Sequence, residues 1–266
     1  MKEYLDCAIE AALTAGKILN EGFGESFKIF NKEGKNNLVT EYDFKSEKTI
    51  IEIIKTKFPN HSFLAEESGK SGAKADDNVK WIIDPLDGTV NFAHNLPIFS
   101  ISIAAEYNNE IICGVIFNPV LNELFTAQKG GGAYLNGIKI NVSDSDDMQS
   151  SFLVTGFPYN VNLNPCGCID HFVNIIKSGI PIRRLGSAAL DLAYVACGRF
   201  DGFWEVYLHP WDVAAGFLII TEAGGRVTQY NLQKYQIESE TILATNGLIH
   251  EQIASTLNQC GCEITN

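Results

Sequence analysis

WIIDPLDGT, at residues 81–89, is the clearest structural signal in this 266-residue chain. Its apolar start predicts a buried strand, which runs into the carboxylate of Asp84. Pro85 has no backbone N–H, so we expect the chain to leave the sheet there and the Leu86 carbonyl to be free of strand pairing. That carbonyl and the carboxylates of Asp84 and Asp87 can then converge, and an all-oxygen ligand set suits a hard cation such as Mg²⁺.

The end of this segment has the features of an anion-binding turn. Gly88 allows the backbone to approach a ligand closely, and Thr89 adds a hydroxyl group. If a helix begins directly after them, its N–H groups would point at an anion. A plain turn is the alternative interpretation, because Asp-Pro and Asp-Gly pairs are also common turn formers.

Three further acidic residues stand at the ends of predicted elements. Glu66 follows a short apolar strand at residues 62–65, and a charged turn is the alternative interpretation there. Asp43 and Asp212 each stand at the start of a predicted helix, where a carboxylate is a good N-cap. An N-cap role does not exclude function, because a carboxylate at a helix N-terminus is held rigidly, as a metal ligand must be.

Outside these sites, the hydrophobic pattern predicts an α/β protein whose middle is a mostly antiparallel sheet. Apolar residues at helical spacing predict two helices before the sheet, and helices alternate with strands after it. We expect helices at 3–22, 43–58, 168–178, 187–197, 212–223 and 247–258, and strands at 80–84, 98–106, 110–118, 122–127, 133–135, 181–185, 201–207, 225–229 and 241–245. A soft boundary near residue 145 divides the chain into an N-terminal subdomain, 1–145, and a C-terminal one, 146–266.

The composition excludes several classes of protein. The formal net charge is −12, and so acidic a surface repels a phosphate backbone, which argues against direct binding of nucleic acid. An anionic substrate would need local positive charge, which bound cations could supply. No run of about 18 apolar residues exists, so we expect no membrane-spanning helix.

The seven cysteines include two Cys-Gly-Cys pairs, at 166–168 and 260–262. An odd number without a secretory signal favours reduced thiols and a cytoplasmic location. Four thiolates could form a zinc site, although paired zinc ligands usually have two or more residues between them. A loop and an unstructured chain end are the preferred interpretation of the two pairs.

Taken together and in this order, the acidic motifs resemble those of the inositol monophosphatase family, the Mg²⁺-dependent, lithium-sensitive phosphatases. The resemblance is carried by Glu66-Glu67-Ser68, by Asp84 to Thr89 and by Trp211-Asp212, and it extends over nearly the whole chain. Val39 to Asp43 and Gly186 to Ala189 also match. The family's fold is a layered αβαβα sandwich, usually dimeric, whose two subdomains meet at the metals.

The resemblance implies roles for individual residues. Two to three Mg²⁺ ions would be held by Glu66, Asp84, the Leu86 carbonyl, Asp87 and Asp212, the third and weaker ion lying near Glu66. The catalytic residues would be Thr89, Asp43 and Glu66, with Thr89 and Asp43 orienting and deprotonating the attacking water. Phosphate and polyol would contact Leu86, Asp87, Gly88, Thr89, Gly186, Ser187, Ala188, Glu205 and Asp212, the phosphate being held by the N–H groups of Gly88 and Thr89.

The expected function is therefore hydrolysis of a phosphorylated polyol or sugar, with inositol 1-phosphate as the first candidate. A fructose-1,6-bisphosphatase or broader sugar phosphatase would share every metal ligand, and Arg183 or Arg184 would then meet a second phosphate unless both are surface arginines. A regulatory or transcription-associated interaction protein is a further alternative. Asn36-Asn37 replaces a more usual Asp, which bears on the third ion, and Tyr207 is larger than is usual at the polyol pocket.

Overall fold

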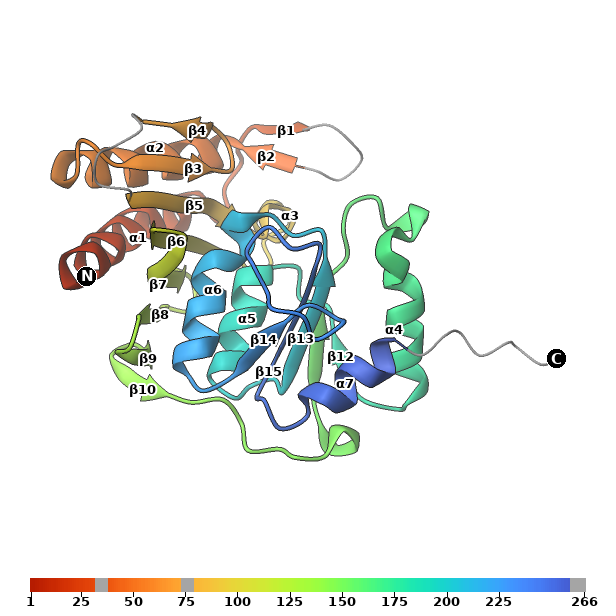
Figure 1. Ribbon diagram of the computed structural model, residues 1–266. Helices are drawn as coiled ribbons and strands as arrows, with labels where there is room; N and C mark the ends of the chain where they lie inside the picture. Colours follow the sequence, from red (N-terminus) through yellow and green to blue (C-terminus); the bar gives the residue numbers. More distant parts are fainter. Residues whose placement is uncertain (32–37, 73–78, 259–266) are drawn as a thin grey trace.

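The computed structural model describes residues 1–31, 38–72 and 79–258 of the chain. Its elements stack as five layers, helices alternating with sheets (Figure 1). The expected αβαβα sandwich is confirmed. Among the described residues no helix is both long enough and apolar enough to cross a membrane.

The first two layers are a helix pair and a large sheet. Helices α1 (Lys2–Gly22) and α2 (Glu41–Lys57) pack on one face of an eight-stranded sheet, in the order β10-β9-β8-β7-β6-β5-β3-β4. The strands are antiparallel except for the β3–β5 pair. Their bounds are β3 (Ser62–Ala65), β4 (Gly69–Ser71), β5 (Val79–Asp87), β6 (Ser100–Tyr107), β7 (Glu110–Asn118), β8 (Glu123–Gln128), β9 (Gly132–Leu135) and β10 (Ile138–Ile140).

The other three layers come from the second half of the chain. Helices α5 (Ala188–Ala196) and α6 (Pro210–Glu222) form the middle layer, buried between the two sheets. The second sheet has the order β12-β11-β13-β15-β14, and α4 (Cys168–Lys177) and α7 (His250–Leu257) cover its outer face. Its strands are β11 (Leu153–Thr155), β12 (Ile182–Arg183), β13 (Gly202–Val206), β14 (Arg226–Thr228) and β15 (Thr241–Thr245).

Several short elements were not predicted from the sequence pattern. Strands β4, β10 and β11 are three residues long, too short for periodicity to reveal, as is the small hairpin of β1 (Ile29–Asn31) and β2 (Leu38–Thr40). Short helices α3 (Thr89–Ala93), η1 (Met148–Ser150), η2 (Val161–Leu163) and η3 (Pro165–Gly167) complete the fold. The position of α3 satisfies the condition set for an anion-binding turn after Gly88.

The expectation that the chain leaves the sheet at Pro85 is wrong. Strand β5 continues to Asp87, and its pairing with β6 shifts register instead: Asp84 lies opposite Ser102, and Asp87 lies opposite Ser100. Three steps on β5 therefore match two steps on β6, which is a β-bulge. Proline is tolerated because the ladder is already interrupted there.

The two aspartates expected as possible N-caps are not N-caps. Thr40 caps α2 and His209 caps α6, and in both helices the aspartate is the third helical residue, whose carboxylate bonds back to the cap. Such capping boxes satisfy N–H groups that the first turn leaves unpaired. Asp43 and Asp212 are thus fixed by helix-capping bonds, one turn deeper than expected.

Candidate active site

The β5 bulge brings Asp84 and Asp87 to the same side of the large sheet. Their partners Ser102 and Ser100 are two residues apart on β6, and alternate residues of a strand share a face. The Ser102 hydroxyl donates to the Trp211 carbonyl at 3.1 Å, which fixes the start of α6 against this face. Asp212, the next residue, therefore lies beside Asp84.

Each of these three carboxylates is anchored through one oxygen. Asp84 Oδ1 accepts the Leu86 N–H at 2.9 Å, and Asp212 Oδ2 accepts the His209 N–H at 2.7 Å. Asp87 Oδ2 accepts the Ser187 hydroxyl at 2.6 Å and the Ala189 N–H at 2.8 Å. A carboxylate has about four lone-pair sites, so an anchored group can still donate to an ion.

The charges at this site repel one another. Burial raises the pKa of Asp84 well above its usual range, and the neighbouring charges of Glu66, Asp87 and Asp212 raise it further. Burial also raises the pKa of Asp212, whose side chain lies within hydrogen-bond reach of Asp84. Two ionised carboxylates cannot approach so closely without a proton or a cation between them.

The donor set therefore fits a hard divalent cation. Glu66, Asp84, Asp87 and Asp212 offer only oxygen donors, as does the Leu86 carbonyl, which suits Mg²⁺. Among the residues that the structure describes, no three His, Cys, Asp or Glu side chains already stand in the arrangement of a metal site. The fit accordingly rests on donor chemistry and mutual repulsion.

Glu66 is positioned by residues that the sequence analysis did not single out. Glu47 of α2, which is 4% exposed, accepts the N–H groups of Glu67 at 2.8 Å and Ser68 at 2.9 Å. Ser46 donates to the Pro85 carbonyl at 2.8 Å, so α2 holds both acidic segments. Ser46 and Glu47 follow Asp43 by three and four residues, so all three lie on one face of the helix. This spacing could have revealed both residues in the sequence.

Asp43 and Thr89 form the pair that the resemblance implied. The Thr89 hydroxyl lies 3.0 Å from Asp43 Oδ1 and 3.0 Å from the Leu86 carbonyl. Asp43 Oδ2 accepts the Thr40 N–H at 2.7 Å and the Thr40 hydroxyl at 2.6 Å. Burial raises the pKa of Asp43 to about 6, against the opposing effect of these hydrogen bonds. A carboxyl with that pKa can accept a proton near neutral pH.

A second turn, at Gly186, lies close to the turn at Gly88. Gly88 has φ 92°, and a Cβ there would lie 2.9 Å from the Ile98 carbonyl and 3.3 Å from that of Gly186. Asn91 ties the two turns together, donating to the Leu185 carbonyl at 2.9 Å. Ser187 then caps α5. The predicted residues Gly88, Thr89, Gly186, Ser187 and Ala188 are thus brought to one side of the carboxylates.

Glu205 lies on β13 beside the same cluster. It is 7% exposed, and burial followed by the charges of Asp212 and Asp87 raises its pKa, while Arg184 lowers it. Gly156 makes room for it, because a Cβ at that position would lie 2.1 Å from the Glu205 carboxylate. Asp191 is a further buried carboxylate that the sequence analysis missed, and its Oδ1 has no hydrogen-bond partner among the described residues.

The two candidate arginines have different surroundings. The Arg183 guanidinium lies over the Phe152 ring at 4.9 Å and donates to the Ile182 carbonyl at 2.9 Å. Arg184 instead exerts its charge on Glu205 and Asp191. Of the two arginines, Arg184 is therefore the one whose charge acts on the buried carboxylates beside the site. Asn36-Asn37 and the 260–262 cysteine pair lie outside the described residues.

Comparison with known proteins gives one consistent family. The family model described as "Inositol monophosphatase family" matches residues 1–261. The chain is 42% identical to "Inositol-1-monophosphatase" of Synechocystis, over 97% of this chain and 89% of that protein. It is 40% identical to "Nus factor SuhB" of Pasteurella multocida, over 98% and 97%. The structure of inositol monophosphatase from Anabaena superposes with a TM-score of 0.87 at 43% identity, covering 97% and 96%.

Proposed function

The chain belongs to the inositol monophosphatase family, and we propose that it hydrolyses inositol 1-phosphate or a closely similar polyol monophosphate. Membership makes it a metal-dependent phosphoric monoester hydrolase that acts on phosphorylated small molecules. The observation that carries the proposal is the group of four mutually repelling carboxylates beside the Asp43–Thr89 pair.

The proposed roles follow from the contacts. Glu66, Asp84, Asp87, Asp212 and the Leu86 carbonyl would hold Mg²⁺. When bound, the ions would neutralise the phosphate and lower the pKa of water. The Thr89 hydroxyl donates a hydrogen bond to Asp43 or to the Leu86 carbonyl. Its oxygen can then accept a hydrogen bond from a water molecule and so orient it, and Asp43 would take the proton that this water loses. The N–H groups of Gly88 and Thr89 would hold the phosphate.

The proposed polyol end of the site lies between Gly186 and Glu205. Glu205 would accept hydrogen bonds from substrate hydroxyls, which a simple aryl phosphate cannot offer. Arg184 supports a sugar bisphosphate as the alternative substrate, because its charge acts on the same carboxylate. A homodimer, a third ion and a division near residue 145 stay predictions.

The test of the metal assignment is Asp87→Asn. The substitution keeps the side-chain volume and the acceptor for Ser187 but removes a charge from the proposed ligand set. We expect turnover to fall at least about a hundredfold with the fold intact. Phosphate release and circular dichroism check this, and near-full activity in a folded variant would contradict the assignment.

A second candidate function is supported by the names of close relatives. Proteins called Nus factor SuhB are 40% identical over nearly the full length, almost as similar as the named phosphatase. A transcription-associated role would need an interaction that survives loss of catalysis. The Asp87→Asn variant separates the two, because a binding role would persist when phosphate release is lost.

A further inference from the structure

Asp191 is a buried carboxylate that the proposed mechanism does not use. It lies in the first turn of α5 and is 1% exposed. Its Oδ1 and the Ser100 hydroxyl are the two buried side-chain atoms that have no hydrogen-bond partner among the described residues. A buried carboxylate without a partner costs far more free energy than a neutral hydroxyl. Proteins retain such unfavourable groups chiefly at functional sites.

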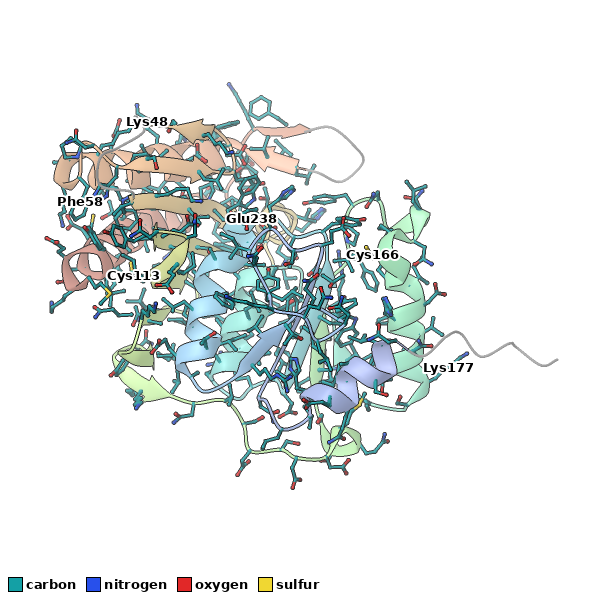
Figure 2. The ribbon with its side chains drawn as sticks, viewed as in Figure 1. Lys48, Phe58, Cys113, Cys166, Lys177 and Glu238 are labelled. Atoms are coloured by element: carbon teal, nitrogen blue, oxygen red, sulfur yellow. The ribbon has the colours of Figure 1, made fainter. Side chains whose placement is uncertain are left out.

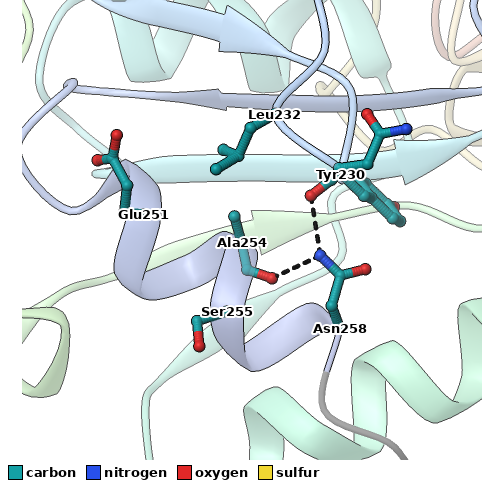
Figure 3. Close-up of a pocket in the computed structure, with 7 residues that line it drawn as sticks. Tyr230, Leu232, Glu251, Ala254, Ser255 and Asn258 are labelled. Atoms are coloured by element: carbon teal, nitrogen blue, oxygen red, sulfur yellow. Dashed lines mark hydrogen bonds between the residues drawn. The ribbon is translucent and has the colours of Figure 1, made fainter.

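Two other polar features in the second half of the chain already have partners. The exposed Cys166, at the outer layer of the molecule (Figure 2), forms a hydrogen bond with Tyr207. In the pocket beside α7, the Asn258 amide donates to the Tyr230 carbonyl at 2.9 Å and to the Ala254 carbonyl at 2.8 Å (Figure 3). Neither feature leaves a buried polar atom unpaired, unlike the carboxylate in α5.

The geometry of α5 places Asp191 beside the site. The Asp191 N–H donates to the Ser187 carbonyl at 3.0 Å, so Asp191 lies one turn after Ser187 on the same face of the helix. The Ser187 hydroxyl in turn donates to Asp87 at 2.6 Å. Helix α5 also packs against β13, which carries Glu205 (Figure 1). Burial raises the pKa of Asp191, and the charges of Glu205 and Asp87 raise it further, as this position requires.

Arg184 is the cation that acts on both carboxylates. Burial raises the pKa values of Glu205 and Asp191, and the charge of Arg184 opposes that effect on each of them. Arg184 itself is exposed, and in the described part of the chain no ion pair of 4.0 Å or less joins it to either carboxylate. One cation thus acts on two buried acidic groups without being fixed to either.

We propose that Asp191 is a positioning residue that draws the Arg184 guanidinium away from Glu205, which leaves Glu205 free to accept hydrogen bonds from the polyol. The inference rests on the proposed function, because it concerns the same polyol end of the site. A guanidinium binds a carboxylate through two N–H groups in a fixed fork. Paired with Glu205 alone, it would occupy the oxygens that substrate hydroxyls need. A second buried carboxylate competes for the same positive charge.

The kinetic test compares the wild type, Asp191→Asn, Arg184→Ala and the double variant, each as the full chain with saturating Mg²⁺. We expect Asp191→Asn to raise the KM for inositol 1-phosphate about two- to fivefold with little change in kcat, because the substrate must then displace a part-exposed ion pair. The rise should be absent in the Arg184→Ala background, because no guanidinium is left to occupy Glu205. A structural role for Asp191 would give the same rise in both backgrounds and would overturn the proposal.

Urea denaturation tests the same interaction without any substrate. At neutral pH the unfolded chain ionises Asp191, so folding must either bury the charge or take up a proton, and both cost free energy. Asp191→Asn avoids that cost and should raise the urea midpoint. Asp191→Leu, which has no polar side-chain atom, should do the same. Arg184→Ala should lower the midpoint of the wild type but not that of Asp191→Asn, and additive effects of the two substitutions would overturn the proposal.

Asp201→Asn is the matched control, because Asp201 is also buried but both of its oxygens are bonded. Oδ1 accepts the Ser143 hydroxyl at 2.5 Å, and Oδ2 accepts the Phe152 N–H at 2.7 Å. This variant should lower the urea midpoint equally with and without Arg184. If the wild type did not hydrolyse inositol 1-phosphate, the proposed function would be contradicted, while the urea comparison would still decide whether Arg184 acts on Asp191.

Discussion

Thr89 is the residue on which the proposed activation of water depends. Its hydroxyl contacts Asp43 and the Leu86 carbonyl, and neither contact requires a bound ion. We expect Thr89→Ala to lower kcat and kcat/KM together by about 10²–10⁴, because the lost interaction acts in the transition state. Thr89→Ser, which restores the hydroxyl, should recover most of the activity. If saturating Mg²⁺ restored the turnover of Thr89→Ala, the residue would be a metal-site residue instead.

Glu205 is the residue on which the proposed substrate specificity depends. Glu205→Gln should reduce kcat/KM for inositol 1-phosphate by roughly five- to 150-fold, because a lost charged hydrogen-bond partner costs about 1–3 kcal/mol. p-Nitrophenyl phosphate has no polyol hydroxyls, so its hydrolysis should change little. Steady-state kinetics with both substrates checks this, and an equal loss on both would mean that Glu205 supports the fold or the metals.

The arginine pair gives a matched test of the bisphosphate alternative. Arg184 acts on the pocket carboxylates, whereas Arg183 is held over Phe152. If fructose 1,6-bisphosphate is a substrate, Arg184→Ala should raise its KM about tenfold or more and leave inositol 1-phosphate unaffected. Arg183→Ala should affect neither substrate. Unchanged KM in Arg184→Ala would remove this alternative.

Helix α2 acts as a scaffold element for the acidic residues. One face carries Asp43, Ser46 and Glu47, and the last of these accepts two N–H groups from the turn after Glu66. Glu47→Gln should destabilise the fold by about 1–3 kcal/mol and raise the Mg²⁺ concentration for half-maximal activity. Glu52→Gln, on the exposed face of the same helix, is the control and should do neither. Urea denaturation and Mg²⁺ titration measure the two effects.

The sequence predicted the long elements well, because their hydrophobic periodicity is unambiguous. Helices α1, α2, α4, α5 and α6 lie within about two residues of their expected positions. The bulge in β5 was not predictable in the same way, because Pro85 alone is equally consistent with a strand that ends. Asp191 was missed for another reason: a carboxylate inside a helix is expected to be exposed to solvent unless its tertiary surroundings are known, whereas the spacing of Glu47 from Asp43 was a signal that could have been used.

At the scale of the whole molecule, the central core joins both halves of the chain. Ile82 and Phe125 of the large sheet pack in one cluster with Leu192 of α5 and Val213 of α6. This packing brings Asp212 beside Asp84. The two residues are 128 positions apart in the sequence, so no local sequence pattern could predict that they meet. The candidate site was therefore predictable as a set of residues, chiefly through the family resemblance, and not as a geometry.

The buried His250 should make the free energy of unfolding depend on pH. It is fully buried, its ring nitrogens each lie 2.8 Å from a threonine hydroxyl, and burial lowers its pKa to about 4. The unfolded chain takes up this proton near pH 6.5, so the stabilisation is complete above that pH and is lost as the pH falls toward 4. The expected loss is about 3 kcal/mol, from about 1.36 kcal/mol per pKa unit.

The variant His250→Gln isolates the contribution of His250 to the free energy of unfolding. Carboxylates with raised pKa values stabilise the fold as the pH falls, over an overlapping pH range, so they oppose the effect of His250 in the wild type. Asp43, whose pKa is raised to about 6, is one of these. The difference in unfolding free energy between wild type and variant, measured in urea at pH 7 and pH 4.5, should shrink at the lower pH. A difference that is independent of pH would show that His250 has the same pKa in the folded and unfolded states.

Because of the bulge in β5, the number of residues between Asp84 and Asp87 matters for function. Asp84 and Asp87 are an odd number of residues apart, yet they share a face because one extra residue is absorbed between them. Deleting either intervening residue would leave both aspartates on one face of a regular strand, but it would remove the bulge in which Asp84 accepts the Leu86 N–H and Thr89 donates to the Leu86 carbonyl. The family site should therefore tolerate substitutions at positions 85 and 86 more readily than insertions or deletions. In a library of variants, a one-codon change of length here should inactivate the enzyme as completely as the loss of an aspartate.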